Sequence, residues 1–228
     1  MNSVQVRVPA TTANLGPGFD SMGVALRLYN VTTINRGRGS DPGDMAENAA
    51  ALFFERSKIK SFRFNWSVEG NVPRSRGLGS SVTVRLGILH GLNALAGKPL
   101  SRRDLFLLCS ELEGHPDNVA ASVHGGMVIA DGDLVSPAPV HLNLSVVVWV
   151  PSADSTSTDR SRATLPTVVN RADAVFNMAR VATLVTAASA GDLALLRRSV
   201  ADRLHQDIRF AAAPASAEAA AVIEQVAG

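Results

Sequence analysis

Residues 73–84, PRSRGLGSSVTV, place two glycines and three serines between a segment that alternates like a strand and a run of helix-forming residues. A strand, a glycine-rich turn and a helix would aim several unpaired N–H groups at one point, with the positive end of the helix dipole behind them. That arrangement suits a phosphate. Gly77 and Gly79 permit close approach of the backbone, and the hydroxyls of Ser80 and Ser81 can bond phosphate or ligate Mg²⁺. The alternative is a tight turn with a serine as the helix cap.

This stretch is not a phosphate loop of the Walker type, because that pattern requires a lysine. The only lysines in the chain are Lys58, Lys60 and Lys98. The basic side chains are mostly arginines, which suit fork-like recognition of carboxylates and phosphates. The net charge is +2 and 5% of the residues are aromatic. This composition argues against binding of nucleic acid.

The elements that must position this stretch follow from the spacing of apolar residues. Alternation predicts strands over residues 4–8, 24–35 and 62–68, with Pro9 ending the first. Helical spacing predicts helices over residues 44–57, 80–97 and 101–113. A capping box formed by Ser101 and Asp104 is expected to open the last of these helices.

The second half of the chain begins with HPDN, residues 115–118, which interrupts the helical pattern. A short helix is predicted near residues 119–123, followed by buried strands over 125–130 and 144–150. The remainder is alanine-rich and reads as mostly helical. The residue composition changes near Pro151, and this change predicts two domains, residues 1–150 and residues 151–228.

Composition places the chain among globular proteins. Its 228 residues are 46% hydrophobic, enough for a substantial core. The single cysteine, Cys109, is predicted to be a buried free thiol, since it cannot form an internal disulfide. No segment approaches the roughly 18 apolar residues of a membrane span, and the N-terminus lacks a leader pattern. We therefore expect a cytoplasmic protein without a membrane association.

Four dispersed segments carry a resemblance to a known family. The pattern PxxxGLGSS at residues 73–81 resembles the second signature of the GHMP kinases, which include galactokinase, homoserine kinase, mevalonate kinase and phosphomevalonate kinase. Within that group, VRVPATTANLGPGFDSMGVAL at 6–26 resembles the N-terminal signature of the homoserine kinases. ELEGHPDNVAASVHGG at 111–126 and DRLHQDIR at 202–209 are similar to their later motifs, in the same order.

The resemblance implies a fold and a reaction. The fold would be α+β, a two-domain GHMP kinase fold with a ribosomal protein S5 domain 2-like N-terminal domain and an incomplete ferredoxin-like C-terminal domain. The reaction would move the γ-phosphoryl group of ATP, with Mg²⁺, onto the hydroxyl of L-homoserine. The product, O-phospho-L-homoserine, serves threonine biosynthesis. A homodimer is expected from the family alone.

The resemblance also implies the residues of the site. The triphosphate would lie against the segment formed by Pro73, Arg74, Ser75, Arg76, Gly77, Leu78, Gly79, Ser80 and Ser81. Homoserine would be bound by Asn14, Asp20, His115, Asn118, Arg162 and Arg209. Ser81 and Glu113 would hold the metal. The catalytic residues would be Asn118 beside the reacting hydroxyl, together with Glu113 and Ser81.

Alternatives remain open for several of these residues. Asn14 and Asp20 could merely stabilise a turn, and Arg162 and Arg209 could be solvated surface residues. Glu111 is a rival metal ligand, although two residues of separation place it on a different helix face from Glu113. Asp117 could suggest a general base, but the resemblance implies substrate alignment and substrate-assisted loss of the proton.

The sequence departs from the family in two places. Val82, Thr83 and Val84 follow GLGSS where the family usually has alanines, which lowers helix propensity slightly. The third, glycine-rich signature of the family is absent, so we expect an incomplete second domain. The chain is either a fragment or a shortened relative with reduced or different activity. Two alternative functions stay open: a GHMP kinase acting on another small alcohol, and a non-catalytic relative that binds nucleotide or a partner, which the missing signature supports.

Overall fold

The computed structural model describes residues 1–37, 43–150 and 163–226. The chain divides into two compact units. Unit 1 comprises Met1–Ala13, Asp20–Arg74 and Leu78–Pro137, and unit 2 comprises Asn14–Phe19, Ser75–Gly77 and Ala138–Gly228. The domain boundary near Pro151 stays a prediction, because residues 151–162 lie outside the described residues.

Unit 1 is built on a sheet whose centre is a long strand. Its strands are β1 (Ser3–Ala13), β2 (Met22–Arg36), β3 (Phe64–Gly70), β4 (Met127–Asp131) and β5 (Leu134–Ala138). They follow the order β1-β2-β4-β5, and β3 also pairs with β2. The pairs that β2 makes with β1, β3 and β4 are all antiparallel.

Pro9 does not end β1, so that expectation is wrong. The strand runs on to Ala13, and its register against β2 shifts between Pro9 and Thr11. A proline lacks the N–H of a ladder bond, but the terminal strand of the sheet order tolerates that loss at a point where the register is irregular. The alternation of β1 is also interrupted here, since the successive residues Ala10 and Thr11 are both fully buried.

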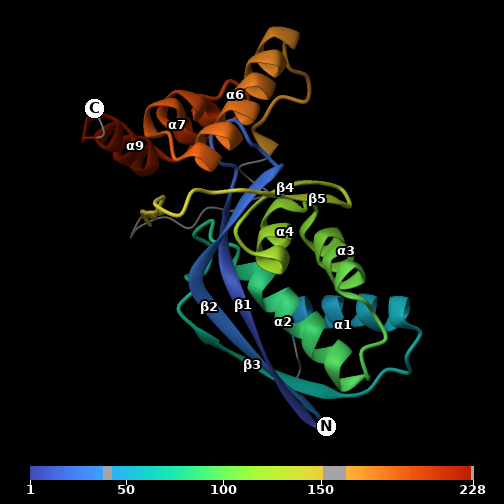
Figure 1. Ribbon diagram of the computed structural model, residues 1–228. Helices are drawn as coiled ribbons and strands as arrows, with labels where there is room; N and C mark the ends of the chain where they lie inside the picture. Colours follow the sequence, from blue (N-terminus) through green and yellow to red (C-terminus); the bar gives the residue numbers. More distant parts are fainter. Residues whose placement is uncertain (38–42, 151–162, 227–228) are drawn as a thin grey trace. The chain divides into compact units, whose positions relative to one another are not determined.

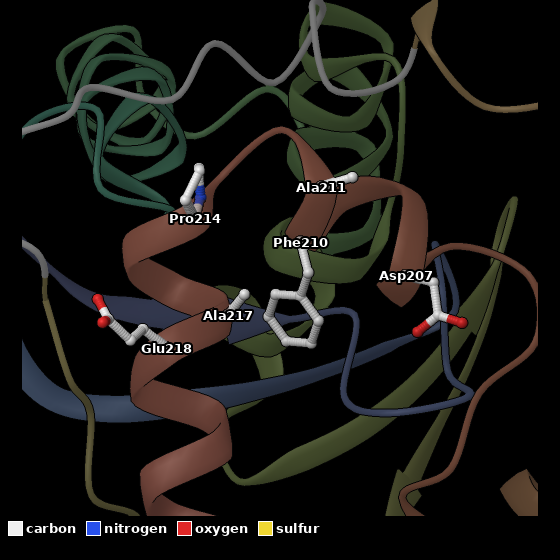
Figure 2. Close-up of a pocket in the computed structure, with 6 residues that line it drawn as sticks. All are labelled: Asp207, Phe210, Ala211, Pro214, Ala217 and Glu218. Atoms are coloured by element: carbon white, nitrogen blue, oxygen red, sulfur yellow. The ribbon is translucent and has the colours of Figure 1, made fainter.

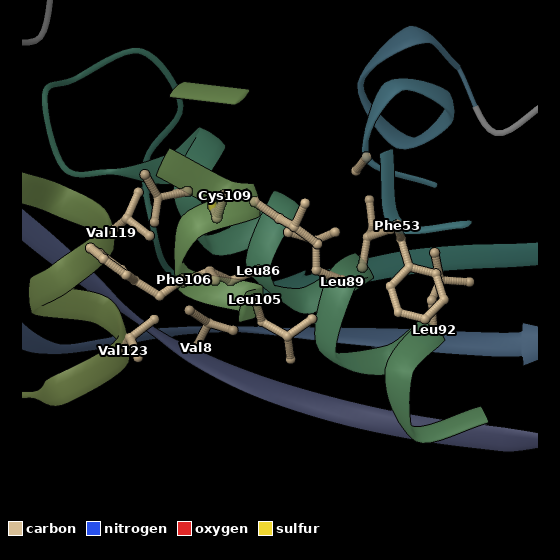
Figure 3. Close-up of a cluster of buried hydrophobic side chains, with 14 of the residues drawn as sticks. Val8, Phe53, Leu86, Leu89, Leu92, Leu105, Phe106, Cys109, Val119 and Val123 are labelled. Carbon is tan, nitrogen blue, oxygen red and sulfur yellow. The ribbon is translucent and has the colours of Figure 1, made fainter. Parts of the chain in front are cut away.

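Four helices cover one face of this sheet (Figure 1): α1 (Asp44–Ser57), α2 (Ser80–Leu95), α3 (Arg102–Glu113) and α4 (Asp117–His124). The prediction of residues 44–57 is confirmed, as is the capping box, in which Ser101 accepts from the Asp104 N–H. Figure 3 shows the core between these layers, with side chains from β1 and all four helices. This core fixes the ends of α2, α3 and α4 relative to β1.

Unit 2 is mainly helical in the described ranges, as predicted. Its helices are α6 (Arg171–Ala190), α7 (Leu193–Ser199), α8 (Gln206–Ala211) and α9 (Pro214–Val226). The buried strand expected over residues 144–150 is wrong: the segment is coil, and Val147 is 93% exposed. Strand-forming side chains need a neighbouring ladder, and no described segment pairs with this one. In the three described ranges, no helix combines the length and the apolar character required to cross a bilayer.

Cys109 on α3 is fully buried and free, as predicted. Burial raises the pKa of its thiol, and the neighbouring Glu113 carboxylate raises it further. The reactive thiolate is therefore scarce in the native protein. We expect a disulfide reagent such as Ellman's reagent to label the folded chain at least about 100-fold more slowly than the chain in denaturant. Equal labelling rates would contradict the burial of this thiol.

Candidate active site

The N-terminus of α2 presents open backbone donors. Gly79 is the N-cap residue, with φ 62° and ψ 31°, and no side chain caps this end. The alternative of a serine cap is therefore wrong, since Ser80 is already the first helical residue. The first backbone hydrogen bond of the helix runs from Thr83 N–H to Gly79 O, at 3.0 Å. The N–H groups of residues 80–82 therefore lack acceptors within the helix. They are the donors expected to receive an anion.

Gly79 is required here by both conformation and space. Its φ lies in the left-handed region, and a Cβ at this position would collide with Thr11 Oγ1 on β1. The preceding residue is bonded to the same strand, with Thr11 N–H donating to Leu78 O at 3.2 Å. The start of α2 is thus seated directly against the buried end of β1.

Ser81 and Glu113 form the polar centre of the site. Ser81 Oγ donates to Glu113 Oε2 at 2.9 Å, and Arg85 Nη1 lies 2.6 Å from Glu113 Oε1. Arg85 also donates to Leu112 O at 2.7 Å, so it holds the end of α3 as well as the carboxylate. The Glu113 side chain is only 8% exposed. Glu111, the rival, is half-exposed and pairs with Arg56 at 2.8 Å.

A hydroxyl and a carboxylate are oxygen ligands of the kind that Mg²⁺ prefers. No group of three or more His, Cys, Asp or Glu side chains suited to a metal ion occurs in the described part of the chain. A magnesium ion at Ser81 and Glu113 would therefore take its other ligands from nucleotide phosphates and water, as is usual for this ion. The residues present fit such a shared site.

The HPDN segment forms a bonded cluster at the start of α4. Asp117 is fully buried, and its Oδ1 lies 2.6 Å from His115 Nδ1 and accepts the Asn118 N–H at 2.7 Å. Thr11 Oγ1 donates to Asn118 Oδ1 at 2.8 Å. Asp117 Oδ2 is buried without a hydrogen-bond partner among the described residues. Asp117 and Thr11 thus fix the two predicted substrate-binding side chains, His115 and Asn118.

Asn14 and Asp20 flank the connection between β1 and β2. Both have left-handed backbones, with φ 60° and 54°. Asn and Asp tolerate this conformation better than most residues, so the turn role considered for them is consistent with their backbones. Asn14 belongs to unit 2 and Asp20 to unit 1. Their binding of substrate stays a prediction.

The structure does not bring the remaining predicted residues together in one unit. Arg209 is on α8, with its guanidinium carbon 5.9 Å from the Phe19 ring centroid. Arg162 lies outside the described residues. In the phosphate segment, Pro73 and Arg74 belong to unit 1, whereas Ser75, Arg76 and Gly77 belong to unit 2. Their contacts with a nucleotide stay predictions.

Two residues of the site, Thr11 and Arg85, were not predicted. Thr11 lies inside the N-terminal motif, but the expected strand end at Pro9 hid its burial. Arg85 stands four residues after Ser81, on the same face of α2, and this spacing was the available signal. Both act by orienting neighbouring side chains of the site.

A cavity of about 670 Å³ lies between α8 and α9, with Phe210 and Ala217 facing it (Figure 2). Its other lining residues are Asp207, Ala211, Pro214 and Glu218. None of the predicted site residues lines it. It therefore adds nothing to the candidate active site.

Family models, similar sequences and similar structures agree on the proteins that this chain resembles. Residues 44–126 match the GHMP kinases N terminal domain. The chain is 40% identical to a homoserine kinase of Moorella thermoacetica over 231 residues, covering 93% of this chain and 78% of that protein. It is 39% identical to a homoserine kinase of Synechococcus, covering 96% and 79%. The crystal structure of a Cytophaga hutchinsonii homoserine kinase has the same fold, with TM-score 0.77, 24% identity and coverage of 92% and 75%.

Proposed function

Because this chain belongs to the homoserine kinase family of GHMP kinases, we propose that it transfers the γ-phosphoryl group of ATP to the hydroxyl of L-homoserine. The product is O-phospho-L-homoserine, a precursor in threonine biosynthesis. The observation that carries this proposal is the Ser81 and Glu113 pair, bonded at 2.9 Å beside the open N-terminus of α2. Phosphoryl transfer depends mainly on positioning and charge neutralisation, which this arrangement supplies.

The N-terminus of α2 would hold the nucleotide. The N–H groups of residues 80–82 donate to phosphate oxygens, and the segment from Pro73 to Ser81 surrounds the triphosphate. Mg²⁺, bound by Ser81 and Glu113, would neutralise charge that develops on the phosphate oxygens. Arg85 holds Glu113 Oε1 at 2.6 Å, so the other carboxylate oxygen keeps its orientation toward Ser81.

Each remaining predicted residue would recognise one group of homoserine. The Asp20 carboxylate pairs with the ammonium group, assisted by Asn14. Arg162 and Arg209 bind the carboxylate with guanidinium forks. Asn118, oriented by Thr11, aligns the reacting hydroxyl, and His115, oriented by Asp117, binds beside it. The hydroxyl proton passes to the transferring phosphate, so the proposal assigns no side chain as general base.

The two alternative functions are not favoured. The relatives described above match across more than nine-tenths of this chain, and both are homoserine kinases. We therefore propose L-homoserine, in preference to another small alcohol, as the acceptor. A cytoplasmic location and a homodimer complete the proposal, both by analogy with the family.

The test is release of ADP from MgATP with and without L-homoserine, in wild-type protein and in Asp20→Asn. Asparagine keeps the shape and tolerates the left-handed backbone of this position, but it removes the charge that pairs with ammonium. We expect the KM for homoserine to rise about 30-fold, with the KM for ATP unchanged. Release that does not depend on homoserine, or an unchanged KM for homoserine in the variant, would contradict the proposal.

A further inference from the structure

The loop Asn14–Phe19 belongs to unit 2, and two buried side chains of the same unit, one on α6 and one at the N-cap of α8, bond to it. His205 Nε2 lies 2.8 Å from Gly16 O, and Asn177 Nδ2 donates to Pro17 O at 3.3 Å. A carbonyl oxygen only accepts, so His205 carries its hydrogen on Nε2. His205 is 4% exposed and Asn177 is 3% exposed. The two bonds are therefore shielded from water.

The loop also packs closely against other residues of its own unit. At Gly16, with φ 51°, a Cβ would lie 2.7 Å from Val200 O. The Phe19 ring stacks on His205 with centroids 4.9 Å apart, and the Arg209 guanidinium lies over the same Phe19 ring. Phe19 thus links the loop both to His205 and to one of the predicted carboxylate-binding arginines.

Asp202 organises the residues that hold this loop. Its Oδ1 accepts from Asn177 Nδ2 at 2.6 Å, and its Oδ2 accepts the N–H groups of Leu204, His205 and Gln206 at 3.0, 2.8 and 2.8 Å. Burial alone would raise the pKa of Asp202, but the hydrogen bonds from Gln206, His205 and Asn177 outweigh it and lower the pKa. An ionised Asp202 therefore fixes both donors that reach the loop.

We infer that Asn177, Asp202 and His205, here called the loop anchor, are positioning residues for binding of L-homoserine. They hold residues 14–19 in the conformation that presents Asn14 and, through Phe19, they fix Arg209. This inference rests on the proposed function for its effect on homoserine. The immobilisation of the loop rests only on the contacts described above. Loop immobilisation and homoserine binding are therefore tested by separate measurements.

The first measurement is amide hydrogen exchange in the absence of any substrate. Gly18 N–H donates to Leu15 O at 3.0 Å within the loop, so its exchange reports on the loop conformation. His205→Phe retains the aromatic stack but removes the donor to Gly16. We expect amide exchange in residues 14–19 to become about tenfold faster, the factor that loss of one buried hydrogen bond typically carries.

The second measurement is steady-state kinetics on the same variant. We expect the KM for L-homoserine to rise about tenfold, with kcat and the KM for ATP within about twofold of wild type. His205→Gln retains an amide N–H of similar reach, and we expect it to restore most of the loop protection and of the KM. The matched control is Asp207→Asn. Asp207 is an exposed carboxylate on α8 (Figure 2), with no described hydrogen bond or ion pair to the loop.

Unchanged exchange in folded His205→Phe would overturn the loop anchor. Faster exchange with an unchanged KM for homoserine would overturn its role in substrate binding. If wild-type protein fails to phosphorylate homoserine, the proposed function fails and the exchange experiment still decides whether the loop is anchored. If His205→Phe does not fold, Asp202→Asn supplies the comparison, and loop exchange equal to that of wild type in this variant would overturn the inference.

Discussion

Glu113→Gln is expected to lower kcat for homoserine phosphorylation by about 10³-fold. Glutamine keeps the volume and can still accept from Ser81, but it removes the charge that Mg²⁺ and Arg85 both require. Arg85 then faces a neutral amide in a site where Glu113 is 8% exposed. The measurement is initial velocity at saturating ATP and homoserine, with far-ultraviolet circular dichroism to confirm the fold.

Glu111→Gln is the matched control for this prediction. Glu111 stands on the same helix, two residues earlier, and its half-exposed salt bridge with Arg56 is of a kind that contributes little to stability. We expect kcat within about twofold of wild type for this variant. If Glu113→Gln kept more than a tenth of the wild-type rate, Glu113 would not be the metal ligand of this site.

Gly79→Ala is expected to weaken ATP binding by about 100-fold and to lower the free energy of unfolding by about 3 kcal/mol. Two effects add at this position. A left-handed φ of 62° is unfavourable for a residue with a Cβ, and that Cβ would collide with Thr11 Oγ1. Relief of the collision must move the start of α2 away from β1, and the donors of residues 80–82 move with it. Calorimetric titration with ATP and chemical denaturation measure the two effects.

Alanine substitutions at two further glycines distinguish the effect of backbone strain from the effect of the collision. Gly77 has φ 70° and Gly97 has φ 86°, and a Cβ at either would meet no atom within 4 Å. Alanine at each should therefore lower the unfolding free energy by only about 1–2 kcal/mol through backbone strain. Gly97 lies beyond the end of α2, so Gly97→Ala should leave ATP affinity unchanged. An ATP affinity for Gly79→Ala equal to that for Gly97→Ala would refute the close-approach argument.

Local patterns sufficed for elements whose determinants lie within a few residues. The helix over residues 44–57 and the Ser101 and Asp104 capping box depend on neighbouring residues only, and both were predicted. The strand predicted over residues 144–150 is wrong because its formation depends on a partner elsewhere in the chain. Its valines satisfy a strand pattern, but a strand also requires a partner, and no sequence window contains that information.

The candidate site shows the same limit. The choice of Glu113 over Glu111 as the metal ligand followed from the resemblance and stays a prediction. The structure adds that Arg85, a residue on another helix, bonds to the Glu113 carboxylate. Thr11 could not be predicted, because its contact with Asn118 spans 107 positions of sequence. Sequence patterns predicted which residues carry the reactive groups, whereas the residues that orient them depend on tertiary packing.

The register shift between β1 and β2 constrains how this gene can diverge. Between the pairs Pro9–Tyr29 and Thr11–Ala25, β1 has one residue and β2 has three, so the extra residues of the irregularity lie on β2. Deletion or insertion of a single residue in β1 before Thr11 would shift the strand by one position and turn Thr11 to the opposite face of the sheet, away from Asn118. Lineages that keep this site should therefore vary in residue type at positions 9 and 10, but not in the number of residues.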